Sequence, residues 1–397
     1  MSRAAHLVLF LSVFVAVLGG MHWYLWARLV RDTGLPEPWR RGLTAAIVLA
    51  AVSLPLTMVA LRAAPRLAQR LAAPAFFWLG LSFILLVALA AADLARLVGA
   101  AAASLAGRGD LPDDPARRLF LGRAMAGGAL LVSAGCAAAG TRSAFSDPMI
   151  HEVPVALPKL PPALSGFTIA QLSDLHVGPT IGEREVRRLT ERTNALRADA
   201  VVITGDLVDG SVADLGRAVA PLAGLRAPHG VYFVTGNHEY YSGAEAWLRE
   251  LRRLGIRVLA NERVALGDGG PGGARFDLAG THDWASGQFG HGPDLAAALD
   301  GRDPDRALVL LQHQPRGMDE AVRRGVGLQL SGHTHGGQIV PFNLLVRAFY
   351  PYVAGLYRHQ GQGAAGQIFV SRGAGFWGPP IRLGAPAEIA KLVLLPG

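Results

Sequence analysis

Three long stretches without a charged side chain constrain this chain more than any other feature of its sequence. They cover residues 4–27, 42–61 and 71–92. Each is close to the ~20 residues that an α-helix needs to cross the hydrocarbon core of a bilayer. A fourth run, residues 124–141, is shorter and rich in alanine and glycine. We therefore expect about four transmembrane helices within residues 1–142, in a multi-pass protein of the cell (inner) membrane.

The arginines between these runs predict an orientation. The expected loops on one side carry eight arginines, namely Arg28, Arg31, Arg40, Arg41, Arg96, Arg108, Arg117 and Arg118. The other side has four, which are Arg3, Arg62, Arg66 and Arg70. Because cytoplasmic loops are enriched in basic residues, the side with eight is expected in the cytoplasm. The N-terminus and everything after the fourth run then lie outside, so the predicted catalytic domain is extracytoplasmic.

The segment that precedes the fourth run leaves an alternative open. Arg117 and Arg118 are followed by Leu-Phe-Leu, which resembles the twin-arginine export signal. An arginine pair can also simply anchor the end of a membrane helix. The fourth run is therefore either a true span or an export signal that is cleaved.

The charge distribution argues against a nucleic-acid partner. The chain carries a net charge of +8, but residues 1–150 hold 14 basic and 7 acidic side chains, against 24 and 23 in the remainder. A nucleic-acid binder needs its positive charge on a folded recognition surface, whereas here the excess lies in the apolar half. Cys136 is the single cysteine, which excludes an intrachain disulfide and a cysteine zinc cage. The sequence does not determine the oligomeric state.

Beyond the apolar half the pattern changes to that of an α/β domain. Residues 143–164 contain five prolines and are expected to form an extended linker, followed by a domain over residues 165–397. The expected strands are residues 167–172, 200–204, 231–235, 276–279, 307–312, 328–330, 367–370 and 389–394. The expected helices are residues 183–196, 212–225 and 244–254. Alternation of short apolar runs with amphipathic stretches predicts a buried sheet flanked by helices.

Polar residues follow the carboxyl ends of five of these strands, where open α/β sheets bind ligands. They are Asp174 and His176; Asp206 and Asp209; Asn237, His238 and Glu239; His313; and His333 and His335. Each block alone is common by chance, but their ordered combination is not. We therefore expect the five strand ends to converge on one crevice.

The donor types in that crevice predict a metal site. Carboxylate, imidazole and amide ligands together suit Mn, Fe or Zn better than Ca or Mg. There are too many donors for one tetrahedral ion, and they suit two divalent ions that share a bridging carboxylate. Such a pair can hold a hydroxide between the ions and bind the oxygens of a phosphoryl group. The sequence thus predicts two transition-metal cofactors and metal-assisted hydrolysis.

These residues resemble the calcineurin-like metallophosphoesterase family, whose pattern is D-x-H, G-D-x-x-D, G-N-H-[DE], a lone His and G-H-x-H. All five blocks are present in order over about residues 167–394. Together with the apolar runs, Gly332–Gln338 resembles the bacterial membrane-anchored branch. The resemblance implies a double β-sheet sandwich flanked by helices, preceded by the α-helical transmembrane region.

The resemblance also implies a role for each block. Asp174, His176, Asp206 and His335 would hold the first metal, and Asp206 would bridge to the second. The second metal would be completed by Asn237, His313 and His333. His238 would act as the catalytic residue, protonating the leaving oxygen or stabilising charge. Asp209 and Glu239 would orient ligands, unless they are solvated turn carboxylates. Arg372 is either a phosphate-binding residue or an ordinary surface arginine.

Three functions follow as alternatives. The first is a membrane-anchored phosphoesterase that hydrolyses phosphomonoester or phosphodiester bonds through a metal-bound hydroxide. The second is a lipid-linked pyrophosphatase of the UDP-2,3-diacylglucosamine hydrolase type, which the predicted outward orientation disfavours. The third is a non-catalytic metal-binding membrane sensor, which the intact blocks disfavour. The lipid bilayer and a phosphate ester, which can be lipid-linked, are the expected partners.

Overall fold

The computed structural model describes residues 3–63, 65–106, 114–268, 272–361 and 363–397. Its contacts divide the chain into two compact units. The helical unit comprises Met1–Arg142 with Gly378–Ile381, and the sheet unit comprises Ser143–Trp377 with Arg382–Gly397. Arg108, which contributes to the predicted orientation, lies outside the described residues.

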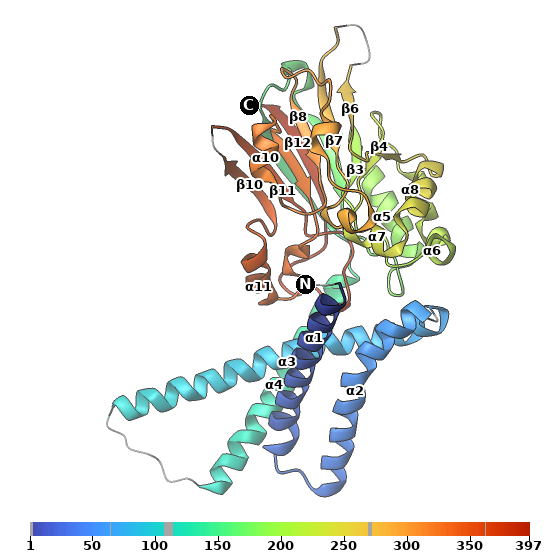
Figure 1. Cartoon of the computed structure of the whole chain (residues 1–397). Coiled ribbons are helices and arrows are strands. Elements are labelled where there is room, and N and C mark those ends of the chain that lie inside the picture. Colours follow the sequence, from blue (N-terminus) through green and yellow to red (C-terminus); the bar gives the residue numbers. More distant parts are fainter. Residues whose placement is uncertain (1–2, 64, 107–113, 269–271, 362) are drawn as a thin grey trace. The chain divides into compact units, whose positions relative to one another are not determined.

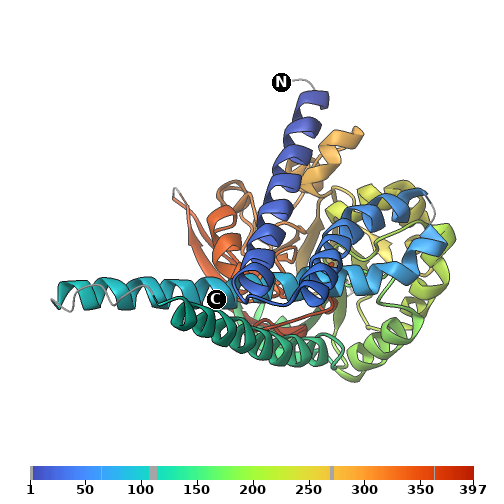
Figure 2. The same cartoon turned by 90° about the horizontal axis from the view of Figure 1, so that it is seen from below.

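The helical unit is built from the predicted apolar runs. Its elements are α1 (Arg3–Trp26), the π-helical turn η1 (Ala27–Arg31), α2 (Glu37–Ala63), α3 (Pro65–Leu105) and α4 (Pro115–Ala144). Among the described residues, four helices are long and apolar enough to cross a membrane. The helix α3 extends well beyond the predicted run and is continuous in both views (Figure 1, Figure 2), because alanine and leucine after Asp93 favour helix.

The charged groups inside the helical unit are paired with one another. Asp93 of α3 accepts a hydrogen bond from the Tyr24 hydroxyl at 2.7 Å and lies 2.9 Å from Arg28. Arg28 also contacts Asp32 at 2.8 Å. These contacts join α3 to α1 and to η1.

The sheet unit consists of two packed sheets with helices on their outer faces (Figure 1). In the described chain each sheet has six strands. The first has the order β1 (Met149–Leu157), β12 (Glu388–Pro396), β2 (Phe167–Leu172), β3 (Ala200–Ile203), β4 (Val231–Phe233) and β5 (Arg257–Val258). The second has the order β10 (Gly355–Gln360), β11 (Ala365–Val370), β9 (Leu328–Ser331), β8 (Leu308–Leu311), β7 (Arg275–Gly280) and β6 (Glu262–Gly267). The predicted double-sheet α/β fold is confirmed.

The core lies in three layers. Ile169 and Val202 of the first sheet are buried with Val309, Leu330 and Phe369 of the second, which fills the space between the sheets. The outer face of the first sheet packs on α5 (Glu183–Ala195), α6 (Val212–Val219) with η3 (Ala220–Gly224), and α8 (Ala244–Arg253). The second sheet is covered by α9 (Leu295–Ala298) and α10 (Met318–Arg323). The shorter elements are η2 (Pro162–Leu164), α7 (Asn237–Ser242), η4 (Trp284–Phe289), η5 (His335–Gly337) and α11 (Phe342–Phe349).

The structure differs from the predicted linker. Within residues 143–164, β1 pairs with β12 in parallel along its whole length. Its alternating side chains Val153, Val155 and Leu157 are buried, although Pro154 lies among them. Proline is tolerated in an edge strand because its missing N–H then faces no neighbouring strand. The alternation therefore outweighs the proline content, and residues 149–157 belong to the sheet unit.

Parallel pairing brings the predicted polar blocks to one edge. Strands β2, β3 and β4 run parallel in the first sheet, and β8, β9 and β11 run parallel in the second. The carboxyl ends of these strands carry the loops that contain the predicted site residues. The two sheets therefore present their ligand-bearing loops to one another across the same end of the sandwich.

Candidate metal centre

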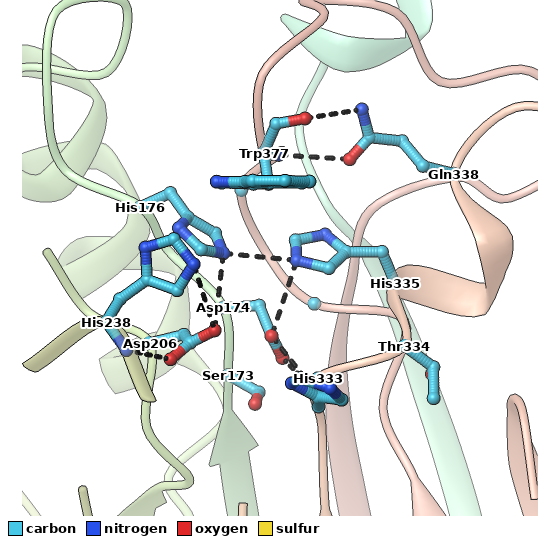
Figure 3. A network of polar contacts seen from close by, with 12 residues as sticks. Ser173, Asp174, His176, Asp206, His238, His333, Thr334, His335, Gln338 and Trp377 are labelled. Atoms are coloured by element: carbon cyan, nitrogen blue, oxygen red, sulfur yellow. Dashed lines mark hydrogen bonds and ion pairs between the residues drawn. The ribbon is translucent and has the colours of Figure 1, made fainter. Parts of the chain in front are cut away.

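The predicted site residues lie together at the carboxyl ends of five strands. Figure 3 shows the side chains of Asp174, His176, Asp206, His333 and His335 pointing toward one another. Among the described residues, three groups of donor atoms lie within 4.8 Å of one another: Asp174, His176 and His335; His176, Asp206 and His238; and Asp206, His313 and His333. Asp206 belongs to two of these groups, and its position between them is the main geometric feature of the site.

The backbone at the strand ends is strained in the same way in several blocks. Asp174, His176, Asp206, His333 and His335 all have positive φ, between 49° and 72°. Non-glycine residues rarely adopt this conformation, and where they do the surrounding structure holds them at functional sites. The strain turns each side chain back from its strand end into the common crevice.

Two glycines allow the loops to approach one another. A Cβ on Gly332 would overlap Ser173 and the Asp174 carboxylate, and a Cβ on Gly236 would overlap the Asp206 carboxylate. In the space that these glycines leave, the Asp174 carboxylate accepts the His333 backbone N–H at 2.9 Å. The glycines in the sequence motifs are therefore required for close contact between loops.

Hydrogen bonds fix which nitrogen of each histidine faces the crevice. Nδ1 of His313 donates to the Thr204 carbonyl at 2.7 Å, so its Nε2 is free and lies 3.1 Å from Asp206 Oδ2. Nδ1 of His176 lies 3.0 Å from Asp209, which leaves its Nε2 pointing inward. A partner on the outer nitrogen is the usual arrangement for a histidine that binds a metal.

On the other side of the crevice, Nε2 of His333 contacts the Tyr350 hydroxyl at 2.7 Å. This leaves Nδ1 of His333 inward, 3.3 Å from Nε2 of His313. Nε2 of His176 lies 3.1 Å from Nε2 of His335. Two ring nitrogens at this separation can coordinate the same cation.

An unpaired oxygen completes the donor set. Oδ1 of Asn237 is buried and has no hydrogen-bond partner among the described residues. A buried acceptor without a partner costs free energy, and a cation would satisfy it. Together with two carboxylates and four imidazoles, this amide oxygen fits divalent transition-metal ions well.

The electrostatics of the buried carboxylates are strongly perturbed. Burial raises the pKa of Asp174 against the opposing charge of His313. Burial and the nearby Asp206 raise the pKa of Glu239 to about 7. Burial alone would raise the pKa of Asp206 as well, but His313 and His238 hold it well below its usual range. Of these three carboxylates, Asp206 is thus the one held ionised, at the position where a cation would bind.

The side chain of His238 is more exposed than those of His176, His313 and His335. Its side chain is 16% exposed, whereas that of His176 is 1% exposed. Nδ1 of His238 contacts Asp209 at 2.6 Å, and Nε2 lies 3.9 Å from Asp206 Oδ2. Burial alone would lower its pKa, but Asp206 and Asp209 raise it to about 9. His238 is therefore held at the open side of the site with a carboxylate on its outer nitrogen.

Glu239 and Asp209 hold neighbouring loops together. The buried Glu239 carboxylate accepts the backbone N–H groups of Gly236 at 2.6 Å, Asp206 at 3.0 Å and Leu207 at 2.8 Å. Asp209 contacts both His176 and His238. Glu239 is buried, and Asp209, whose side chain is 25% exposed, contacts two site histidines, so both carboxylates have partners within the site.

Arg372 does not offer a free charge to a phosphate. Its guanidinium contacts the Glu388 carboxylate at 2.5 Å, and its backbone N–H donates to the same carboxylate at 2.8 Å. The Glu388 side chain is 2% exposed and that of Arg372 is 30% exposed. The structure therefore favours a structural role for Arg372.

Sequence reasoning missed Tyr350 and Arg382. Tyr350 contacts His333, as described above. Arg382 is fully buried and donates to the carbonyls of Gly375 at 2.7 Å and Ala385 at 2.8 Å, and it lies 3.4 Å from His335 Nδ1. A buried arginine has one weak signal in the sequence, its position between Ile381 and Leu383. The tyrosine has none.

Comparison with known proteins identifies the family. Residues 167–337 match the family described as calcineurin-like phosphoesterase. A metallophosphoesterase of Helicobacter pylori is 40% identical over 286 residues, which covers 71% of this chain and 73% of that protein. This chain belongs to the calcineurin-like metallophosphoesterase family. The predicted resemblance is confirmed.

Another relative is named as a transmembrane protein. A bovine "transmembrane protein with metallophosphoesterase domain" is 39% identical over 290 residues, covering 71% of this chain and 64% of that protein. The chain thus spans less than two thirds of the bovine protein. A solved structure of a dimetal phosphatase from Danio rerio is 14% identical, covers 53% of this chain and 88% of that one, and has a TM-score of 0.33. The four apolar helices of this chain and the bovine relative together suggest a membrane protein.

Proposed function

We propose that the sheet unit hydrolyses phosphomonoesters or phosphodiesters at a centre of two divalent transition-metal ions. One observation carries the proposal: the Asp206 carboxylate is shared by two groups of donor atoms that come from different loops. A shared carboxylate is what a pair of ions ~3.5–4 Å apart requires. The membership of the family supports the same chemistry.

The ligand assignment uses the first and third groups. Asp174, His176 and His335 would hold one ion, and Asp206, His313 and His333 the other with Asn237. Asp206 also forms a group with His176, so we propose that it bridges the two ions. We propose Mn, Fe or Zn as the metal, with Mn as the first choice for assays, because the donors mix oxygen and nitrogen. The bound ions would supply Lewis acidity toward phosphoryl oxygens and lower the pKa of water.

The chain's own residues position and protonate the substrate. Asp209 accepts the Nδ1 proton of His238, so the second proton of the imidazolium lies on Nε2, which is 3.9 Å from Asp206 Oδ2. We propose that this Nε2 proton passes to the leaving oxygen of the ester. His313 and His176 are held by Thr204 and Asp209 so that their inward nitrogens keep a fixed direction.

Turnover of aryl phosphate esters tests this proposal. The purified full chain, stripped of metal and reloaded with Mn²⁺, should hydrolyse an aryl phosphomonoester or its diester. Removal of the metal should lower the rate by at least ~10³-fold, since metal ions contribute several kcal/mol of transition-state stabilisation. Activity that survives complete metal removal would contradict the proposal. No turnover of either ester by chain that retains two ions would favour the metal-binding sensor instead.

We also propose that the sheet unit lies outside the cytoplasm. The asymmetry of eight arginines against four supports this orientation. An alkaline phosphatase fused after residue 150 should then be active in a bacterial host, because that enzyme folds productively outside the cytoplasm. A cytoplasmic reporter fused at the same position is the matched control. A silent phosphatase fusion together with an active cytoplasmic reporter would reverse the assigned topology.

A further inference from the structure

The helix α11 lies directly beside the metal centre. It starts five residues after η5, which contains His335, and Asn343 of α11 lies where a Cβ on Gly337 of η5 would be. Tyr350, which follows the last residue of α11, contacts His333 at 2.7 Å. The position of α11 is therefore fixed by contacts with the loop that carries two candidate ligands.

The helix α11 exposes most of its apolar side chains. Leu344, Leu345 and Phe349 are 65%, 51% and 69% exposed, and no residue of the helix is buried. Asn343 faces the sheet unit, since it packs against Gly337 and its Oδ1 is buried, and Val346 is partly exposed. A helix on a soluble domain turns its apolar face inward. Here the apolar residues cover the wide outward face.

The surroundings of α11 have the composition of a membrane interface. Val340, just before the helix, is exposed. Trp377 is 54% exposed, and its backbone forms two hydrogen bonds of 3.0 Å with the side chain of Gln338 (Figure 3). Arg347 is exposed on α11, and Arg316 stacks over the Tyr350 ring at 4.7 Å. Apolar side chains bordered by tryptophan and arginine are typical of helices that lie in the headgroup region.

The same chain supplies a reason to expect a bilayer as the occupant. The same chain carries four helices long enough to cross a membrane, and α4 ends at Ala144, where the sheet unit begins. The two arginines match the negative charge of anionic lipid headgroups. A lipid surface therefore satisfies both the apolar face and its basic border without any additional protein.

We propose that α11, with Val340 and Trp377, is an interfacial docking surface that binds the outer region of a lipid bilayer. The surface is defined by exposed side chains outside the metal site. The proposal therefore does not depend on the enzymatic activity. At the rim of the metal centre, the centroid of the Trp377 ring lies 5.8 Å from that of the His238 ring. Docking at this surface would hold this rim close to the lipid headgroups.

A single-thiol labelling experiment tests the proposal on the full chain. Cys136→Ala removes the only native thiol, and Leu345→Cys then places an environment-sensitive fluorophore on the apolar face of α11. Phe349→Cys, one turn further along, provides a second position. Arg252→Cys on the exposed side of α8 is the matched control. The labelled chains are reconstituted in vesicles of phosphatidylcholine and phosphatidylglycerol.

The two α11 labels should emit at shorter wavelength than the control and should be quenched several-fold more by brominated lipids. The Arg252 label should be quenched by aqueous iodide and not by the lipids. Quenching of the α11 labels by iodide alone would show that the helix lies in water and would overturn the proposal. Protection from both quenchers would also overturn it, because the helix would then be covered by protein.

Discussion

Replacing His238 with alanine should lower kcat by about 10²–10⁴-fold on an aryl phosphate ester, while the metal content remains that of the wild type. A positioned general acid contributes a factor of this size. The metal should be retained because His238 is the most exposed of the site histidines that contact Asp206, and its Nδ1 is occupied by Asp209. Steady-state kinetics and elemental analysis of the same preparation measure both quantities.

Two further variants show whether the effect belongs to the proton donor. His151→Ala removes an exposed histidine of β1 and should leave kcat unchanged. Asp209→Asn keeps the shape of the side chain but weakens the hold on His238 and His176, and should cost about 10–100-fold. Full activity of His238→Ala would remove His238 from the mechanism. Loss of metal in that variant would make His238 a ligand, in the donor group that it forms with His176 and Asp206.

The second large effect is expected for Asp206→Asn, which should abolish the binding of at least one ion and lower kcat by at least ~10³-fold. Asp206 Oδ2 lies 3.1 Å from His313 Nε2 and 3.8 Å from His176 Nε2, so it joins the two donor groups. The amide keeps an oxygen that can still accept the His238 backbone N–H, so the fold should survive. Loss of an ion that stabilises the transition state by several kcal/mol accounts for the size of the effect.

Metal titration of the stripped protein measures this change, with circular dichroism as the check on folding. Asp214→Asn is the matched control, because it removes an exposed carboxylate of α6 that lies outside the site. Wild-type metal affinity and activity in Asp206→Asn would exclude a bridging role for this carboxylate. The same loss in the control would show that the effect is not specific to the site.

Much of the site could be predicted because its residues follow short buried strands. Asp174 follows β2 and His333 follows β9, and all or nearly all residues of both strands are buried. Parallel strands place such residues at one edge of a sheet whatever the details of the loops. The glycines beside these residues, such as Gly332, mark the close approach that the structure shows.

Other features depend on contacts that the sequence does not reveal. The strand β1 is hidden by its prolines, and only its pairing with β12 shows that Val153 and Val155 are buried. Tyr350 reaches His333 through the path of the chain after α11, which no local pattern encodes. The burial of Arg382 depends on carbonyls of a loop that precedes it. These are tertiary effects that override local propensity and polarity.

The number of metal ions bound by the purified full chain tests the central claim most directly. Seven candidate side chains from five strand ends, with Asp206 in two donor groups, fit two ions per chain. Elemental analysis of well-folded protein, dialysed after loading with Mn²⁺, should therefore give about two ions per chain. A value near zero, or a single ion that does not increase with further loading, would contradict a dinuclear centre.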